Sequence, residues 1–251
     1  MFMFVNGSLL TISYIHSMIF QSHILYLLLF TILRNIAIVK ALDRYSRTKQ
    51  PILQTYIYPE GDFMKSIVQA SVIETVTERF IIPHNIRGNI GSALLVFIPM
   101  SLCFEIIFDF FHYWSHRFLH TINLSWHKTH HSYINLKPAI TFYQHWMDLL
   151  LTNSLPLLFT ERIVQSVYPL STFEVSALVT YKIFTEVSGH LGHKGYPTSS
   201  FPQCIWLPRL LGIELYCEDH NLHHTNTNYN FAKRFSLWDK VFGTYQSGLR
   251  H

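Results

Sequence analysis

Residues 91–120 read GSALLVFIPMSLCFEIIFDFFHYWSHRFLH, a long apolar run that ends in histidines. As a helix, the part from residue 93 to residue 120 would span roughly 42 Å at about 1.5 Å per residue. The hydrocarbon core of a bilayer is only about 30 Å thick. The last turns of this helix must therefore leave the membrane, and those turns carry the histidines. Pro99 predicts a kink within the helix.

A polar stripe runs along the same predicted helix. Glu105, Asp109, His112, His116 and His120 follow one another at spacings of three or four residues, which places them on one face. Ionisable groups at membrane depth are costly and usually face a functional interior. We expect Asp109, in a supporting role, to accept a hydrogen bond from His112 or His116 and so fix its tautomer. His112 is predicted to be either a metal ligand or a supporting residue, and for Glu105 a purely structural hydrogen-bond network is the alternative.

The composition favours a membrane protein. Of 251 residues, 49% are hydrophobic and only 14% are charged, against roughly 25% charged in an average soluble domain. This composition excludes a disordered chain and argues against an ordinary soluble enzyme. We predict an all-α integral membrane bundle of about four membrane-embedded helices with a cytosolic histidine-rich helical cap. Residues 1–90 would form an N-terminal membrane helix and cytosolic connection, and residues 91–251 the catalytic domain.

Other segments complete this membrane interpretation. Residues 9–39 are strongly apolar and predict one tilted span or a less regular pair of segments. Residues 40–90 are polar and contain several prolines, which indicates an irregular cytosolic connection. The apolar stretches 146–159 and 172–187 are predicted to form a helical hairpin that enters the bilayer.

Charge and cysteines refine the expected topology. The net charge is +4, and the basic stretch from Arg34 to Lys49 accounts for all of it. The positive-inside rule places such a stretch on the cytosolic side; a nucleic-acid patch is the weaker alternative. The three cysteines form no CxxC motif. The first residues lack a basic start and a cleavage site, so we expect a retained membrane helix rather than a signal peptide.

Three clusters of closely spaced histidines begin at the end of the long helix. Spacings of three and four residues allow each cluster to direct two or three imidazoles at one point. Imidazole is a good ligand for iron, copper, nickel and zinc. The clusters are His116 and His120 in HRFLH, His127, His130 and His131 in HKTHH, and His220, His223 and His224 in HNLHH.

The number of histidines indicates the kind of metal site. These three clusters hold more imidazoles than one four-coordinate zinc ion needs. The pair His190 and His193 adds two more, and two five- or six-coordinate ions would use about that many if positions stay open for water or oxygen. We therefore expect two metal ions in shared surroundings. His145 could line a path for substrate, although plain packing is the simpler interpretation.

The order HRFLH, HKTHH, HNLHH resembles the three histidine boxes (HxxxH, HxxHH, HxxHH) of the fatty acid hydroxylase / sterol desaturase superfamily. The lead-in DFFHYWSHRFLH and the ending NYNFAKRFSLWDKVFGTY are also similar to that superfamily. The resemblance covers about residues 93–245. The N-terminal third carries no recognisable motif.

The resemblance implies an integral membrane, non-haem di-iron oxidoreductase of the endoplasmic reticulum, with its histidine boxes facing the cytosol. Such an enzyme uses two Fe ions and O2 to hydroxylate or desaturate a lipid of sterol or fatty acyl type. We expect no fused haem domain, so electrons would come from a separate cytochrome or ferredoxin, and no nucleic acid is involved. The implied metal ligands are His116, His120, His127, His130, His131, His220, His223 and His224, with His190 and His193 as additional ligands.

Three other functions remain open at this point. A histidine-rich membrane metal transporter or metal-binding protein without redox catalysis would place its histidines along a transmembrane path, whereas most lie beyond the long helix. A zinc hydrolase would need fewer ligands and a motif such as HExxH, which does not occur. A non-catalytic scaffold would have little reason to keep intact boxes.

Overall fold

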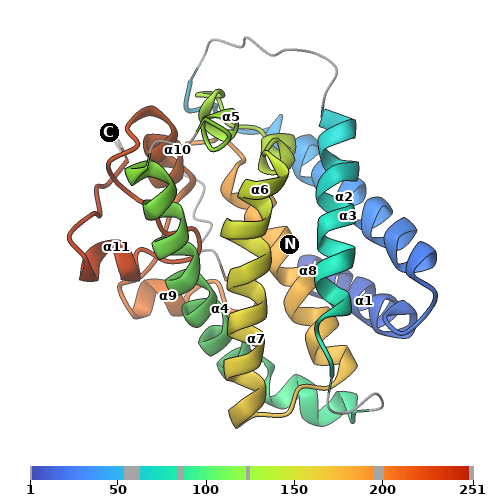
Figure 1. Ribbon diagram of the computed structural model, residues 1–251. Helices are drawn as coiled ribbons and strands as arrows, with labels where there is room; N and C mark the ends of the chain where they lie inside the picture. Colours follow the sequence, from blue (N-terminus) through green and yellow to red (C-terminus); the bar gives the residue numbers. More distant parts are fainter. Residues whose placement is uncertain (1, 54–62, 84–87, 123–124, 195–200, 249–251) are drawn as a thin grey trace.

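A computed structural model describes residues 2–53, 63–83, 88–122, 125–194 and 201–248. In these ranges every regular element is helical, apart from one isolated bridge between Pro51 and His193. The predicted all-α bundle is therefore confirmed (Figure 1). The elements are α1 (Phe2–Ile19), α2 (Ile24–Ser46), α3 (Phe63–Arg79), α4 (Ile90–Thr121), α5 (Lys128–His131), the 3-10 helix η1 (Pro138–Phe142), α6 (Trp146–Leu149), the π-helix η2 (Leu150–Ser154), α7 (Leu155–Val167), α8 (Thr172–Gly189), α9 (Leu207–Leu210), α10 (Cys217–Thr225) and α11 (Leu237–Val241).

Three helices among the described residues are long and apolar enough to cross a membrane, namely α1, α2 and α4. The first apolar run is thus a pair of helices rather than one tilted span. The chain turns after Ile19, and the ring of His23 accepts a hydrogen bond from the Leu25 N–H at the start of α2. The segments that we expected to form a membrane hairpin, 146–159 and 172–187, are not among the three candidates.

Within the stretch 40–90, the described residues 63–83 are more regular and less exposed than the polarity of the sequence predicts. They include α3, whose carboxylates face α2: the Arg34 guanidinium lies 2.7 Å from Glu74 Oε1 and 3.7 Å from Glu78 Oε1. Glu78 Oε2 also lies 3.1 Å from the ring of His16 on α1. Arg34, the first cation of the basic stretch, is therefore buried within the bundle, because carboxylates on α3 compensate its charge.

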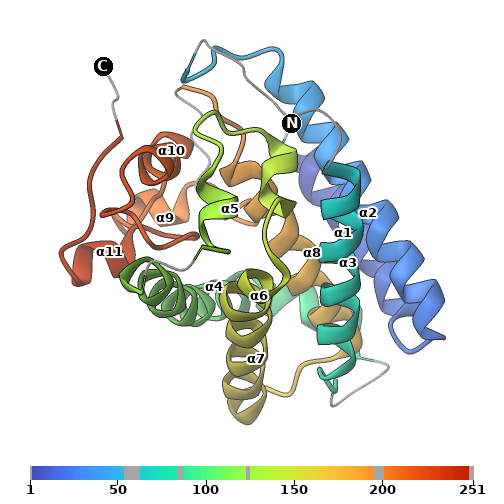
Figure 2. The ribbon, with the colours of Figure 1, turned by 45° about the horizontal axis from the view of Figure 1, so that its top comes forward.

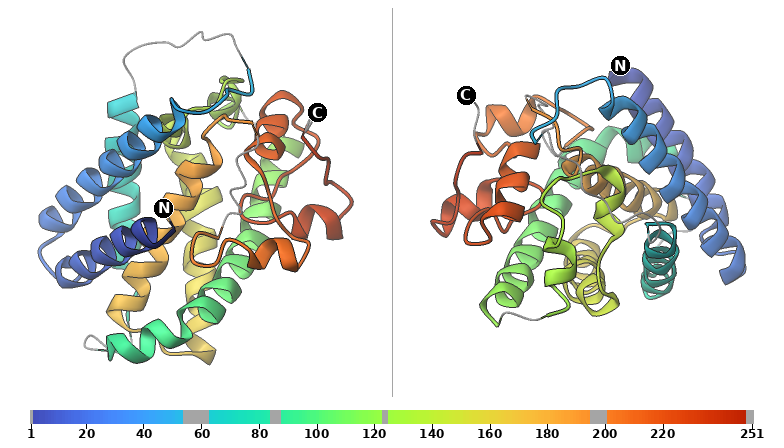
Figure 3. Two further views of the ribbon diagram at one scale, coloured as in Figure 1. Left: turned by 180° about the vertical axis from the view of Figure 1, so that it is seen from behind. Right: turned by 90° about the horizontal axis from the view of Figure 1, so that it is seen from above.

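Helix α4 is as long as its sequence predicts. It has 32 residues, and the side chain of Asn89 caps its start by accepting a hydrogen bond from the Gly91 N–H at 2.9 Å. Its first turns run at an angle to the rest (Figures 1 and 3). Pro99 lies inside the helix and removes one backbone hydrogen bond, which accounts for such a bend. The last three turns carry His112, His116 and His120.

Helix α8 forms the centre of the molecule. Only Phe184 and Gly189 in it are not buried, and α1, α2, α4 and η1 pack around it. Figure 2 shows α8 between α4 and the pair formed by α1 and α2. A capping box between Ser171 and Glu174 fixes its start. Its C-terminal end, followed by His190, meets α10 and the segments beyond it, so the core helix delivers a histidine to the polar end of the bundle.

Candidate metal centre

A first group of five histidines surrounds the end of α4. His116 and His120 come from α4, His127 and His131 from the region of α5, and His223 from α10. Nε2 of His120 lies 3.2 Å from Nε2 of His116, 3.2 Å from Nε2 of His223 and 3.0 Å from Nε2 of His127. Nε2 of His131 lies 3.2 Å from that of His127. All five rings thus direct the same nitrogen at one point.

A second group lies beside the first. His130, His190, His220 and His224 are all buried, and one ring nitrogen from each lies within 4.8 Å of the others. Nε2 of His190 is 3.4 Å from that of His130 and 3.0 Å from that of His220. The ring of His131 is 4.7 Å from that of His224, centroid to centroid. The two groups therefore adjoin, and each HxxHH box contributes to both.

The outward-facing nitrogens fix the tautomers. Nδ1 of His116 donates to the Phe231 carbonyl at 2.8 Å, and Nδ1 of His223 donates to the Tyr229 carbonyl at 2.6 Å. A ring that donates through Nδ1 has a bare lone pair at Nε2 when it is neutral. The two Nε2 atoms of His116 and His223 are 3.1 Å apart, so two acceptors face each other without a proton between them. A metal cation held between them would satisfy both lone pairs.

The spacing of these nitrogens fits a metal ion. Nitrogen ligands held about 2.1 Å from one ion stand about 3.0–3.4 Å apart, depending on the coordination geometry. The closest Nε2 pairs in the two groups lie between 3.0 and 3.4 Å apart. The donor set therefore suits one ion in each group. The individual ligand assignments remain a prediction.

Local backbone structure explains two of the ring orientations. Nδ1 of His112 donates to the Thr152 carbonyl at 2.7 Å; in a regular helix that carbonyl would bond the N–H four residues later, which Pro156 lacks. Nδ1 of His190 donates to the Glu186 carbonyl at 2.8 Å. His190 follows the last turn of α8, where carbonyls have no partner within the helix. A proline and a helix end thus each free an acceptor for a histidine.

Burial keeps the rings neutral. Desolvation lowers the pKa of His190 to about 3 and that of His223 to about 4. It also lowers the pKa of His130, His220 and His224 well below the usual value, and neighbouring histidines contribute. Only a neutral imidazole can coordinate a metal ion. The site is therefore preset for binding metal at neutral pH.

The expected role of Asp109 needs correction. Its carboxylate accepts hydrogen bonds from the backbone N–H groups of Lys233, Arg234 and Phe235 at 2.8, 2.9 and 3.1 Å, whereas His112 and His116 donate to backbone carbonyls. Asp109 therefore does not fix a histidine directly. It holds the segment that contains the Phe231 carbonyl, because three N–H groups of a turn satisfy a buried carboxylate better than one imidazole would.

Glu105 belongs to the same buried support. Its carboxylate lies 2.8 Å from Arg234 Nε, and Nη2 of Arg234 lies 2.7 Å from Glu186 Oε1 on α8. Arg234 is fully buried and joins α4, α8 and the C-terminal segment. Glu105 therefore has a purely structural role, which was the alternative to supporting a histidine.

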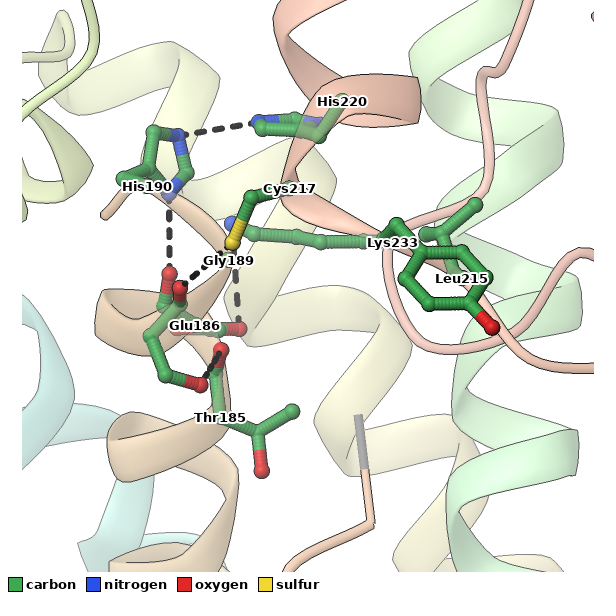
Figure 4. Close-up of a pocket in the computed structure, with 10 residues that line it drawn as sticks. Thr185, Glu186, Gly189, His190, Leu215, Cys217, His220 and Lys233 are labelled. Carbon is green, nitrogen blue, oxygen red and sulfur yellow. Dashed lines mark hydrogen bonds and ion pairs between the residues drawn. The ribbon is translucent and has the colours of Figure 1, made fainter. Parts of the chain in front are cut away.

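Sequence patterns did not single out two residues beside the centre. Asp148 Oδ2 accepts a hydrogen bond from His127 Nδ1 at 3.0 Å, although Asp148 lies 21 residues after His127 and outside the three histidine boxes. Lys233 lines two small cavities, one with His190 and His220 and another with His116 and His127. Figure 4 shows its side chain crossing below His190 and His220 toward Glu186. Burial lowers the pKa of Lys233 to about 8.

The structure leaves His193 outside both groups. Its Nδ1 donates to the Gln50 carbonyl at 3.3 Å, and the isolated bridge with Pro51 turns it away from His190. His112 also belongs to neither group, but its ring centroid is 5.1 Å from that of His116. His145 caps α6 by accepting a hydrogen bond from the Met147 N–H. Nine of the ten predicted ligands thus converge.

Comparison with known families decides the classification. A profile described as fatty acid hydroxylase matches residues 101–244. The chain belongs to the fatty acid hydroxylase family. In this member of the family, the matched region begins within α4 and includes both histidine groups.

This member of the fatty acid hydroxylase family is similar in sequence to several individual proteins. The chain is 33% identical over 171 residues to a fatty acid hydroxylase of Lecanicillium sp, covering 64% of this chain and 46% of the relative. It is 30% identical over 149 residues to the human alkylglycerol monooxygenase (55% and 29% covered) and 30% over 150 residues to a Delta(7)-sterol 5(6)-desaturase of Gibberella zeae (59% and 37%). The chain thus spans less than half the length of these relatives. No solved structure matches it significantly.

Proposed function

We propose that this protein is a membrane-bound, non-haem di-iron oxidoreductase that uses O2 to hydroxylate or desaturate a lipid of sterol or fatty acyl type. The observation that carries the proposal is the convergence of nine histidines into two adjoining groups. Five rings in one group would leave one position free on a six-coordinate ion, and four rings in the other would leave one or two positions free on a five- or six-coordinate ion. Open positions are what an oxygen-activating site needs and a purely structural site lacks.

Iron bound by these histidines would supply the two-electron activation of O2. The chain itself holds the ligands neutral, aims them through hydrogen bonds at Nδ1, and surrounds them with buried side chains that exclude water. His116, His127 and His223 are each oriented by a different acceptor. Lys233 keeps a proton at Nζ beside the second group and balances the carboxylate of Glu186 at 3.9 Å.

The lipid substrate follows from the surroundings and the relatives. The printed names of the relatives are those of a fatty acid hydroxylase, an alkylglycerol monooxygenase and a sterol desaturase. Two members of the first group, His116 and His120, lie in the last turns of α4, a candidate membrane-crossing helix. A lipid in the bilayer can therefore approach the centre sideways along this helix.

We further propose the endoplasmic reticulum as the membrane, with the histidine groups on its cytosolic side. The basic residues that follow α2 support this orientation through the positive-inside rule. Two electrons per turnover would come from a separate cytochrome or ferredoxin at that face.

A metal transporter accounts less well for the arrangement. Transport requires ligands spaced along a path and rings that can release the ion. Here the rings close around two points, and buried carbonyls or a carboxylate restrain five of them through Nδ1. This arrangement retains metal.

The decisive experiment compares oxygen-dependent lipid products in membranes that contain the protein and variants of it. His130→Ala and His223→Ala each remove one ligand from a different group. His145→Asn is the matched control, because it removes a histidine outside both groups while Asn can still cap α6. Iron content is measured in the same membranes by elemental analysis.

We expect the two ligand variants to lose bound iron and to abolish product, while His145→Asn keeps both. Product formed at the normal rate by His130→Ala with His223→Ala would contradict the proposal. Metal flux into sealed vesicles without any lipid product would favour the transporter.

A further inference from the structure

Large apolar side chains are exposed on the segment that contains α9. The buried side chains of residues 201–213 pack against Leu102 and Ile106 in the middle of α4, and Figure 1 shows α9 beside this part of α4. The outward face carries four apolar side chains with exposed fractions between 51% and 73%, namely Ile205, Trp206, Leu210 and Leu211. These four side chains form the α9 surface. A contiguous group of this kind marks contact with a membrane or with another protein.

The local sequence fixes the shape of this segment. Pro208 lies in the first turn of α9, where its missing N–H costs no helical hydrogen bond. Gly212 follows the helix with φ +65°, the left-handed conformation with which glycine commonly ends a helix. The Ile213 N–H then donates to the Pro208 carbonyl at 2.8 Å. A closed backbone turn therefore holds the four apolar side chains outward.

The α9 surface lies next to two candidate membrane-crossing helices, α1 and α4. Besides the packing on α4, the side chain of Asn6 on α1 donates to the Pro202 carbonyl at 2.9 Å. Met3 and Phe4, in the same first turns of α1, are exposed as well. The exposed apolar side chains of the α9 segment therefore continue those of a helix with the length and apolarity of a membrane span.

The contacts also place the α9 surface on the same side of the bilayer as the histidine groups. Because α1 and α2 are consecutive helices, two crossings bring the start of α1 and the end of α2 to one side. Just after α2, the Ile52 N–H donates to the Gly192 carbonyl at 2.9 Å, two residues after the ligand candidate His190. On α4, Ile106 precedes His116 by ten residues, or about 15 Å. The α9 surface therefore lies deeper than the histidines.

The residue types around the α9 surface suit the boundary between lipid and water. Trp206 is of the type enriched at that boundary, because its ring is apolar and its N–H is polar. Arg209 and Lys240 are exposed, and Lys240 Nζ donates to the Gly212 carbonyl at 2.6 Å. Cations beside apolar side chains favour a bilayer surface with its phosphate headgroups. In a contact between two copies of this surface, the cations would face like charges, which is unfavourable.

We propose that the α9 surface is inserted into the bilayer leaflet on the side of the histidine groups and acts there as an interfacial anchor. The anchored segment leads directly into α10, which carries His220, His223 and His224. The anchor and α4 together then set the height of the histidine groups above the acyl chains. The proposal does not depend on the reaction at the metal centre.

The test locates α9 in vesicles of phosphatidylcholine that contain the full chain. Cys103→Ser removes the exposed native cysteine, and the other two cysteines are buried. In this background Leu210→Cys carries an environment-sensitive fluorophore, and Ile205→Cys gives a second probe of the same surface. Asn228→Cys is the matched control, because Asn228 is exposed and lies beyond α10. Quenching is measured with a phospholipid that bears a nitroxide near its headgroup, and separately with aqueous iodide.

We expect the nitroxide lipid to quench the label at positions 205 and 210 at least threefold more strongly than the label at position 228, and iodide to show the reverse order. Equal quenching by iodide at positions 210 and 228 would overturn the proposal. A label at position 210 that is shielded from both quenchers would mean that protein, such as a second copy of the chain, covers the surface, and would overturn it as well.

Discussion

The hydrogen bond between Asp148 and His127 allows the contribution of one side chain to metal affinity to be measured. Asp148 accepts the Nδ1 proton of His127 and is itself buried. A carboxylate in this position orients the ring for metal binding, and loss of such partners typically costs about 10–100-fold in metal affinity. We expect Asp148→Asn to keep the fold and weaken metal binding by about that factor, as measured by competition with a chelator.

The control for Asp148 is the partly exposed carboxylate of Asp43. Asp43→Asn removes a charge of the same kind that pairs with the exposed side chain of Arg47, where an ion pair contributes little. Unaltered chelator competition in Asp148→Asn would show that the His127 ring is fixed by packing alone.

The packing of α2 against α3 depends on a cluster of buried charged side chains. Arg34 on α2 pairs with Glu74 and lies near Glu78 on α3, and its side chain is fully buried. Removal of one partner leaves an uncompensated buried charge, which typically costs about 3–5 kcal/mol. We expect Arg34→Met to lower the free energy of unfolding by that amount, as followed by denaturant unfolding in detergent.

A triple variant, Arg34→Met with Glu74→Gln and Glu78→Gln, separates charge from shape. It removes both signs of charge together, so much of the lost stability should return. If the triple variant were as unstable as Arg34→Met alone, packing of the arginine side chain rather than its charge would hold α2 against α3.

The same elements show how far the sequence predicts this fold. The length of α4 and the all-α class follow from apolar periodicity, and the three histidine clusters follow from spacing. The burial of Arg34 could not be predicted, because it depends on carboxylates about forty positions away that reach it only after folding. The segment 172–187 was expected to be one arm of a membrane hairpin because of its apolar composition. It forms α8, the central helix of the bundle, because hydropathy does not distinguish lipid from protein surroundings.

Prediction of the site was limited in a comparable way. Histidine spacing identified nine residues that converge, but spacing gives no information about what each Nδ1 contacts. Asp109 was expected to hold a histidine and instead holds a turn, because the 233–235 backbone offers three donors to it. His193 lies three residues after His190 and still diverges from it, since the bridge with Pro51 turns the loop.

At the scale of the whole molecule, metal should act as a crosslink. The two groups join α4, the α5 region, the end of α8 and α10, which are far apart in the sequence. A ligand that binds only the folded state stabilises it by about 2.7 kcal/mol when present at 100 times its dissociation constant. We expect a chelator to lower the apparent unfolding temperature of the unchanged chain and to have little effect on His130→Ala with His223→Ala. An equal effect on both would argue against metal at these groups.

Acid should destabilise the metal-free protein through the same histidines. Burial holds the pKa of His190 at about 3 and that of His223 at about 4, whereas an unfolded histidine titrates near 6.5. Below pH of about 6.5 the unfolded chain therefore binds protons that the folded chain does not, and stability falls by about 1.4 kcal/mol per pH unit for each such ring.

Asp239 opposes this trend, because burial raises its pKa to about 6, so protonation below pH 6 favours the folded state at that one carboxyl. The histidines with a lowered pKa outnumber the carboxyls with a raised pKa, such as Glu161 and Asp239, and we expect net loss of stability between pH 6.5 and 5 in chelator-treated protein. Denaturant unfolding at fixed ionic strength measures it, and the slope should be shallower in His190→Asn, which removes one titrating ring. A stability that rises on acidification over this interval would mean that the rings are not buried as neutral groups.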